Sequence, residues 1–289
     1  MIGESLALLA AFGWVGSSIF LEKASKEAGS LAVNLIRLVL AMVFLGMITQ
    51  MNRGMLLPLD VSKESLKYLS VSGLFGLFLG DFFLFKAYLK IGPRITLLVM
   101  TFSPIAVSIL SFVILKEKIE LLKIVGMLLT ISGIAMVILK KKSDESFSKL
   151  GFIYAVLAMF GESFGIVFTR MGSIDYDSFA TIQVRTIPAI LAFILYITYR
   201  KEWGDIKDGA VNKKAMLYIS LGTIIATMGV TSLVEAMKHA HVGIVSTLAA
   251  TSPILIIPIS IVCFKEKISA LEVVGAMVSF VGITTFFIL

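Results

Sequence analysis

Apolar residues in this chain form ten long blocks, separated by short charged or turn-rich segments. Each block is about 20 residues long, which at ~1.5 Å per residue matches the ~30 Å hydrocarbon core of a bilayer. No polar segment is long enough to form a soluble domain. The pattern predicts transmembrane helices at residues 2–21, 31–51, 67–88, 94–115, 121–139, 150–170, 179–199, 215–237, 242–264 and 271–289.

The composition also indicates a membrane protein. Hydrophobic residues make up 58% of the chain and charged residues 16%, whereas a soluble domain is nearer half apolar and a quarter charged. The first block is long and follows no Lys or Arg, so we interpret it as a membrane span and not as a cleaved signal peptide. The predicted fold class is an all-α integral membrane protein with ten transmembrane helices.

The net charge of +7 does not indicate nucleic acid binding in a chain of this kind. Most basic residues lie in the short loops between spans, where they influence orientation in the membrane. They are more frequent after odd-numbered helices, which by this rule places both termini outside the cytoplasm. The single cysteine, Cys263, lies in an apolar block, so we expect a packing role and no internal disulfide.

The second half of the chain repeats the first. With a shift of 149 positions, residues 80–139 align with residues 229–288 without a gap. Both segments contain Ser-Pro-Ile followed by Lys-Glu-Lys-Ile, at Lys116–Ile119 and at Lys265–Ile268. An apolar bias alone would not align a proline and three charges in register.

Earlier positions align with a shift of 148, including Gly13 with Gly161 and Arg37 with Arg185. Each half has five spans, an odd number, so the second copy enters the membrane from the opposite face. Inverted repeats of this kind support alternating access to a site at their interface. The predicted organisation is a first repeat at 1–142, a linker at 143–149 and a second repeat at 150–289.

In each half the same elements follow in order: an aromatic-glycine pair, an arginine in the second helix, Ser-Pro-Ile, Lys-Glu-Lys, Val-Gly and Gly-Ile. With this order the whole chain resembles the EamA family of the drug/metabolite transporter superfamily. The resemblance implies a secondary transporter of the plasma membrane, often an exporter of amino acids or other small metabolites. It implies a cavity lined by helices 1–4 and 6–9, and termini inside the cell, against the charge rule. The orientation therefore stays open.

Charged residues inside spans are costly, at about 2.5–3.5 kcal/mol each on insertion scales, and therefore mark cavities or paired sites. The topology places Arg37 near Asp81, and by the same logic Arg185 near Glu235. Each pair is either a structural salt bridge or part of a gate or substrate site. A further cation, Lys86, occupies the position equivalent to Glu235.

Glu162 lies mid-way along the sixth span, where its equivalent in the first repeat is Trp14. No cation is expected at its depth, and an unpaired buried carboxylate favours its protonated form. This suits proton coupling or binding of a cationic amine. The alternative is a carboxyl group bonded to helix backbone or to a facing serine.

Prolines and polar residues in the fourth and ninth spans are further candidates. Pro104 and Pro253 are expected inside these helices, where each removes a backbone hydrogen bond and exposes carbonyls to a cavity, or simply bends the helix. Polar or aromatic side chains near the inferred cavity could bind substrate or serve in packing: Trp14, Tyr88, Thr101 and Thr251.

No enzyme signature is present in the sequence. His239 and His241 are too few for a metal site, and phosphate loops, nucleophile elbows and cysteine pairs are absent. We predict no cofactor and no ATP-driven motor. Besides a metabolite transporter, 21 Phe and 14 Met keep open a flippase or multidrug exporter of amphipathic molecules. A non-transporting scaffold would not need charges facing a cavity.

Overall fold

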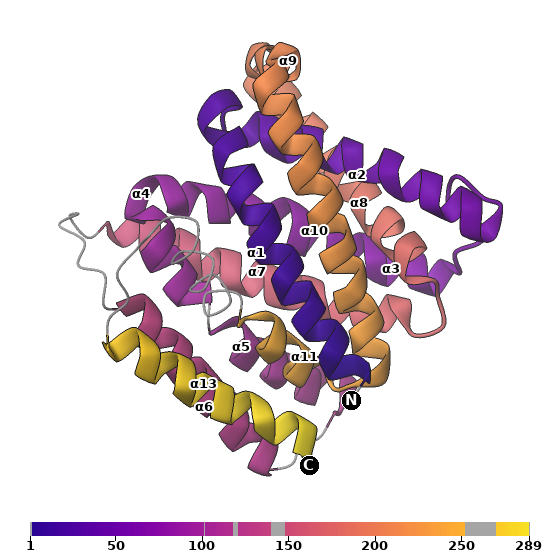
Figure 1. Ribbon diagram of the computed structural model, residues 1–289. Helices are drawn as coiled ribbons and strands as arrows, with labels where there is room; N and C mark the ends of the chain where they lie inside the picture. Colours follow the sequence, from indigo (N-terminus) through magenta and orange to yellow (C-terminus); the bar gives the residue numbers. More distant parts are fainter. Residues whose placement is uncertain (1, 101, 118–120, 140–147, 252–269, 289) are drawn as a thin grey trace.

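The computed structural model describes residues 2–100, 102–117, 121–139, 148–251 and 270–288. These residues form helices joined by short connections, and no strand occurs among them. Long helices cross one another at the centre, and two further helices lie side by side at one edge (Figure 1). The elements are α1 (Ile2–Ala28), α2 (Ser30–Arg53), α3 (Lys63–Ser72), the π-helix η1 (Gly73–Gly80), α4 (Asp81–Met100), α5 (Ser103–Leu110), the π-helix η2 (Ser111–Leu115), α6 (Leu121–Leu139), α7 (Lys149–Ser173), α8 (Ser178–Arg200), α9 (Trp203–Val211), α10 (Lys213–His239), α11 (Val242–Ala249) and α13 (Ala270–Ile288).

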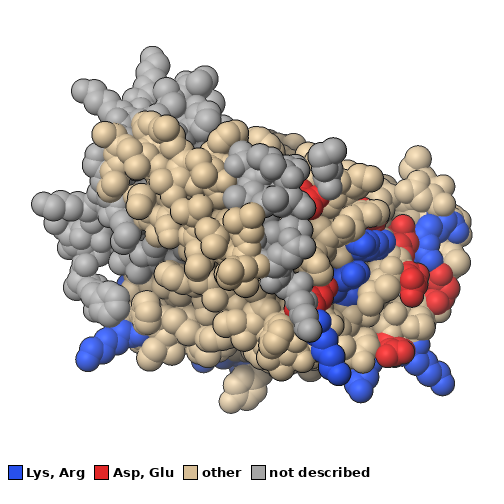
Figure 2. Space-filling model, turned by 90° about the horizontal axis from the view of Figure 1, so that it is seen from below, with Lys and Arg blue, Asp and Glu red and all other residues tan. Residues whose placement is uncertain are grey.

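Six of the helices in the described residues are long and apolar enough to cross a bilayer. Three shorter apolar helices correspond to the predicted fourth, fifth and tenth spans. The predicted ninth span begins as α11 and continues into residues outside the described part, so the count of ten is not confirmed. Many large apolar side chains face outward, as lipid contact requires; Leu195 is 71% exposed and Phe280 67%. In Figure 2, charged side chains gather toward one side, beside a broad uncharged surface.

The two repeats interlock through equivalent helix crossings. In one crossing α1 packs antiparallel on α10, with Gly13 against Gly229. In the other, α7 packs antiparallel on α3, η1 and α4, with Gly161 against Gly80. These two glycine pairs are the same pair under the sequence shifts of 148 and 149, so the predicted repeat reappears as a repeated contact.

The outer pair of helices, α6 and α13, has the same symmetry within itself. A side chain on Gly133 would clash with Ser279, and one on Gly282 would clash with the equivalent Thr130. The Ser279 hydroxyl donates a hydrogen bond to the Thr130 carbonyl over 2.8 Å. The small residues therefore let these helices approach closely, across an axis that relates one repeat to the other.

Two local predictions are wrong. The α4 helix continues through the expected turn near residues 89–93. Pro104 does not lie inside a helix: it stands in the first turn of α5, after a break before Ser103, where a missing N–H leaves no helical bond unmade. The polar connection between the seventh and eighth predicted spans, residues 200–214, contains α9, which packs on α2 through Gly209 and Ala32.

Candidate functional site

An ion pair lies at the centre of the bundle, between α2 and the start of α4. The Arg37 guanidinium contacts the Asp81 carboxylate, and both side chains are largely buried, at 16% and 20% exposure. Arg37 Nε also donates to Asn34 Oδ1, one turn earlier on α2, at 3.0 Å. The predicted pairing of Arg37 with Asp81 is confirmed, and Asn34 fixes the direction of the arginine.

The equivalent arginine of the second repeat lies close to the same acid. Arg185 is 5% exposed, and its Nε has no hydrogen-bond partner. Its guanidinium packs on the backbone of η1: a Cβ added to Gly76 would lie 3.0 Å from Nη2. Asp81 begins α4 directly after η1, five residues beyond Gly76, which is slightly more than one turn of the helix. The charges of Arg185 and Asp81 act on each other.

Glu162 completes this group, which we call the central charge cluster: Arg37, Asp81, Glu162 and Arg185. Glu162 lies on α7 where that helix crosses Gly80, whose added Cβ would be 3.3 Å from the Glu162 nitrogen. Within the described residues its carboxylate has no hydrogen bond and no ion pair. The charges of Asp81 and Arg185 both act on it. The expectation that no cation lies at the depth of Glu162 is therefore wrong.

The η1 segment allows this approach and was missed by the sequence reasoning. Its sequence, GLFGLFLG, has buried glycines at Gly73, Gly76 and Gly80. An added Cβ at Gly76 would also lie 3.2 Å from the Cα of Gly165 on α7. Glycine spacing was the available signal, but it indicated only helix packing. A π-helix inserts a wider turn, and such turns are frequent at functional sites.

Hydroxyl groups hold α7 to two neighbouring elements, α3 and α5, in the turns that follow Glu162. At α3, Ser72 Oγ donates to the Gly165 carbonyl at 2.7 Å and lies 2.6 Å from Thr169 Oγ1. At α5, Ser163 Oγ and Ser103 Oγ are 3.1 Å apart. Since Ser103 begins α5, the break in the fourth span brings a helix start beside Glu162.

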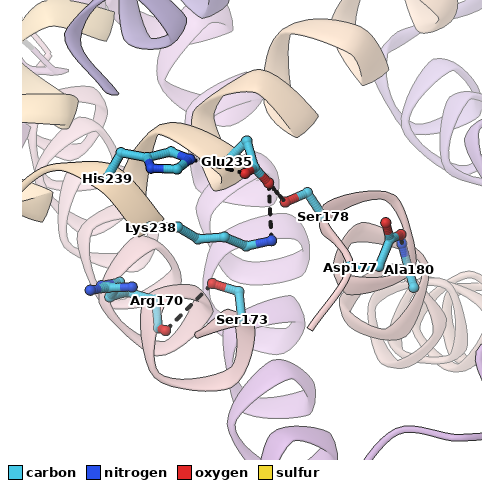
Figure 3. Close-up of polar contacts among 8 residues, drawn as sticks. All are labelled: Arg170, Ser173, Asp177, Ser178, Ala180, Glu235, Lys238 and His239. Atoms are coloured by element: carbon cyan, nitrogen blue, oxygen red, sulfur yellow. Dashed lines mark hydrogen bonds and ion pairs between the residues drawn. The ribbon is translucent and has the colours of Figure 1, made fainter. Parts of the chain in front are cut away.

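Glu235 does not pair with Arg185, and that prediction is wrong. Figure 3 shows its carboxylate at the end of α10, bonded within its own neighbourhood. It accepts a hydrogen bond from Ser178 Oγ at 2.6 Å and from Lys238 Nζ at 3.0 Å, and it lies 3.2 Å from His239 Nε2. Arg185 lies two turns further along α8 than Ser178, so the helix carries it away from Glu235 to the bundle centre.

A second carboxylate, that of Glu117, lies at the same membrane face as Glu235, where α7 and α10 end. It contacts residues of α7, of α11 and of the connection before α11. Glu117, two residues after the end of η2, accepts a hydrogen bond from the Val242 N–H at 3.2 Å. It also lies 3.8 Å from Arg170 Nε and 3.7 Å from His241 Nδ1. Glu117 belongs to the first repeat and its three partners to the second. This face of the interface between the repeats is therefore closed by polar contacts.

At the same membrane face, the connection between α2 and α3 is bonded to residues of the second repeat, Tyr176 and Gln183. Asp60 accepts a hydrogen bond from the Tyr176 hydroxyl at 2.9 Å and contacts Arg53 at 2.5 Å. The hydrogen bond from Tyr176 and the charge of Arg53 hold the pKa of Asp60 below its usual value. Gln183 Nε2 donates to the Leu56 carbonyl at 3.0 Å.

The remaining predicted residues do not join the central charge cluster. Trp14 packs against the apolar core around α1, α10 and α11. The Thr251 hydroxyl donates a hydrogen bond to the carbonyl of Leu248, three residues earlier in the chain. Lys86 lies 4.0 Å from the centre of the Phe82 ring. Three candidates lie outside the described part of the structure: Pro253 and Thr101 entirely, and Tyr88 by its side chain.

An apolar cavity of about 340 Å³ lies on the outer pair of helices, away from the charge cluster. Its lining consists of Leu129, Val274, Met277, Val278 and Val281. Without polar groups it suits a lipid chain and cannot orient a polar substrate. No cluster of three or more His, Cys, Asp or Glu side chains occurs among the described residues.

Comparison with known proteins matches both halves of the chain. The model of the EamA-like transporter family matches residues 1–139 and again residues 149–288. Twenty-nine chains of solved structures are similar. One protein crystal structure superposes with a TM-score of 0.79, at 14% identity, over 99% of this chain and 96% of the other. That identity establishes a shared fold only. A search of curated proteins finds no match.

Proposed function

The chain belongs to the EamA-like transporter family, and we propose that it is a secondary transporter that exports small polar metabolites such as amino acids. It is a multi-pass membrane protein and not an enzyme. In the proposal it resides in the plasma membrane and works by alternating access between two inverted repeats.

The central charge cluster is the observation that carries the proposal. Four ionisable side chains meet between the repeats, although two of them, Glu162 and Arg185, form no ion pair within the described residues. A scaffold gains nothing from such groups, because each costs free energy at membrane depth. A transporter uses them to bind polar groups or protons that cross the membrane.

We assign Glu162 the role of coupling or substrate-binding acid. Its carboxylate can accept a proton or the ammonium group of a substrate, and Arg185 beside it can accept an anionic group. Arg37 and Asp81 would hold the cluster in position. No cofactor is needed for this cycle.

A thermal-shift screen tests the proposal with amino acids, nucleosides, sugars and amines at two pH values. A substrate should raise the melting temperature, because a ligand that binds only the folded state stabilises it. Stabilisation by amphipathic molecules alone would favour the flippase instead. In proteoliposomes, Glu162→Gln should remove the pH dependence of transport, whereas the exposed control Glu64→Gln should retain it. Full pH-dependent transport by Glu162→Gln would contradict the role given to Glu162.

A further inference from the structure

The repeat symmetry relates the two central arginines but does not relate their acids. Arg37 and Arg185 occupy equivalent positions under the shift of 148. The position equivalent to Asp81 in the second repeat is Val230, which cannot form an ion pair. Two symmetry-related arginines therefore share one carboxylate on the third helix.

The two arginines differ in their present contacts. Arg37 forms an ion pair with Asp81 and a hydrogen bond with Asn34. Arg185 is more deeply buried, its Nε has no partner, and it lies on Gly76 about one turn from Asp81. The helices that carry the arginines, α2 and α8, pack on each other and are themselves equivalent. Asp81 thus contacts the Arg37 guanidinium and lies about one helical turn from the residue on which Arg185 packs.

We propose that Asp81 exchanges its ion pair from Arg37 to Arg185 when the protein turns its opening from one membrane face to the other. The proposal rests on the alternating access of the proposed function. In such a cycle the two repeats exchange conformations, so Arg185 takes up the arrangement that Arg37 has now. Because Val230 carries no charge, Asp81 is the one acid at these two equivalent positions that can pair with Arg185.

The exchange also explains why Glu162 lies beside Arg185. In the present arrangement the charge of Arg185 acts on both Asp81 and Glu162. Once Arg185 pairs with Asp81, less of its charge is available to Glu162. A proton or a cationic group must then neutralise Glu162, because an uncompensated buried charge is costly. The exchange would couple uptake at Glu162 to the change of facing.

Distance measurements between spin labels test this without a known substrate. In purified protein in lipid nanodiscs, with Cys263→Ala as background, one labelled pair is Leu59→Cys with Asp175→Cys. A second pair, at the opposite face, is Lys90→Cys with Lys207→Cys. All four positions are exposed, and each pair joins the two repeats. The present arrangement is the population whose distances agree with the structure.

Arg37→Gln should decrease the ratio of the present to the alternative arrangement by at least about tenfold, because it removes a pair that only the present arrangement has. Arg185→Gln should increase that ratio by a similar factor. In an Asp81→Asn background the two arginine variants should no longer differ. Arg37→Lys and Arg185→Lys keep the charge and should show weaker shifts of the same signs. These lysine variants provide the test if a glutamine variant does not fold.

Shifts of both arginine variants in the same direction would overturn the exchange while leaving alternating access in place. So would opposite shifts that persist in Asp81→Asn. A single distance population at both faces in every variant, with the wild type included, would contradict alternating access itself and the proposed function with it.

Discussion

The crossing of α7 over η1 positions Glu162, and one substitution should separate the two helices. Gly165 lies at this crossing, where an added Cβ would stand 2.6 Å from the Cα of Gly76 and 3.0 Å from its nitrogen. Ordinary contact begins at 3.4 Å, so a side chain requires a separation of about 0.8 Å. Backbone atoms cannot rotate away from it. The Gly165→Val substitution applies this perturbation.

The expected loss follows from overpacking, which costs about 1–3 kcal/mol. Valine gains little helix propensity over glycine, a few tenths of a kcal/mol at most. We therefore expect a loss of about 2 kcal/mol, or a decrease in melting temperature of about 4–8 °C. Transport should also fall, because α7 moves Glu162 away from Asp81.

Thermal unfolding of the detergent-solubilised protein measures the effect, and proteoliposome transport measures its consequence. Gly204→Val is the matched control, because no heavy atom lies within 4 Å of its Cβ position. The reasoning is refuted if Gly165→Val melts and transports like the wild type, or if Gly204→Val is equally damaging.

Three further predictions concern the charged groups. Asp81→Asn leaves Arg37 buried without its partner, so it should lower stability by about 3–5 kcal/mol; the double variant with Arg37→Gln should lose less than the sum in unfolding experiments, and exact additivity would contradict the coupling. The pKa of Asp60 is lowered in the folded state, so its contribution to stability should be complete above about pH 4 and disappear as pH falls through the lowered value; melting curves of Asp60→Asn should lack this acid-dependent part. Glu117→Gln should loosen its face and increase maleimide labelling of a cysteine at Ser173, which is buried there, in the purified protein; unchanged labelling would show that Glu117 does not hold this face closed.

The sequence predicted the features that depend on periodicity and on exact repetition. The duplication was visible because two glycines, a proline and three charges keep their register, and the structure shows Gly13–Gly229 and Gly161–Gly80 as equivalent contacts. The pairing of Arg37 with Asp81 followed from depth alone. The second span starts at the membrane face where the third span ends, so a residue early in one and a residue late in the other lie at similar depth.

The errors arose where depth and position around a helix axis had to be combined. Glu235 and Arg185 were paired by depth, but Glu235 finds closer donors in Ser178 and Lys238. Pro104 was expected to lie inside a helix, but the preceding helix ends before it and Pro104 stands in the first turn of the next helix, α5. A π-helix cannot be inferred from glycine spacing, because the additional residue per turn is selected by tertiary contacts.

The central claim is that the two repeats lie in opposite directions across the membrane. Leu59 and Lys207 are equivalent under the shift of 148, both are exposed, and both lie in connections between spans. Single cysteines at these positions, in the Cys263→Ala background, can be labelled in intact cells with a membrane-impermeant maleimide. Labelling of one position from outside and of the other only after the membrane is opened is the predicted result. Labelling of both from the same side would contradict the inverted arrangement and the alternating access derived from it.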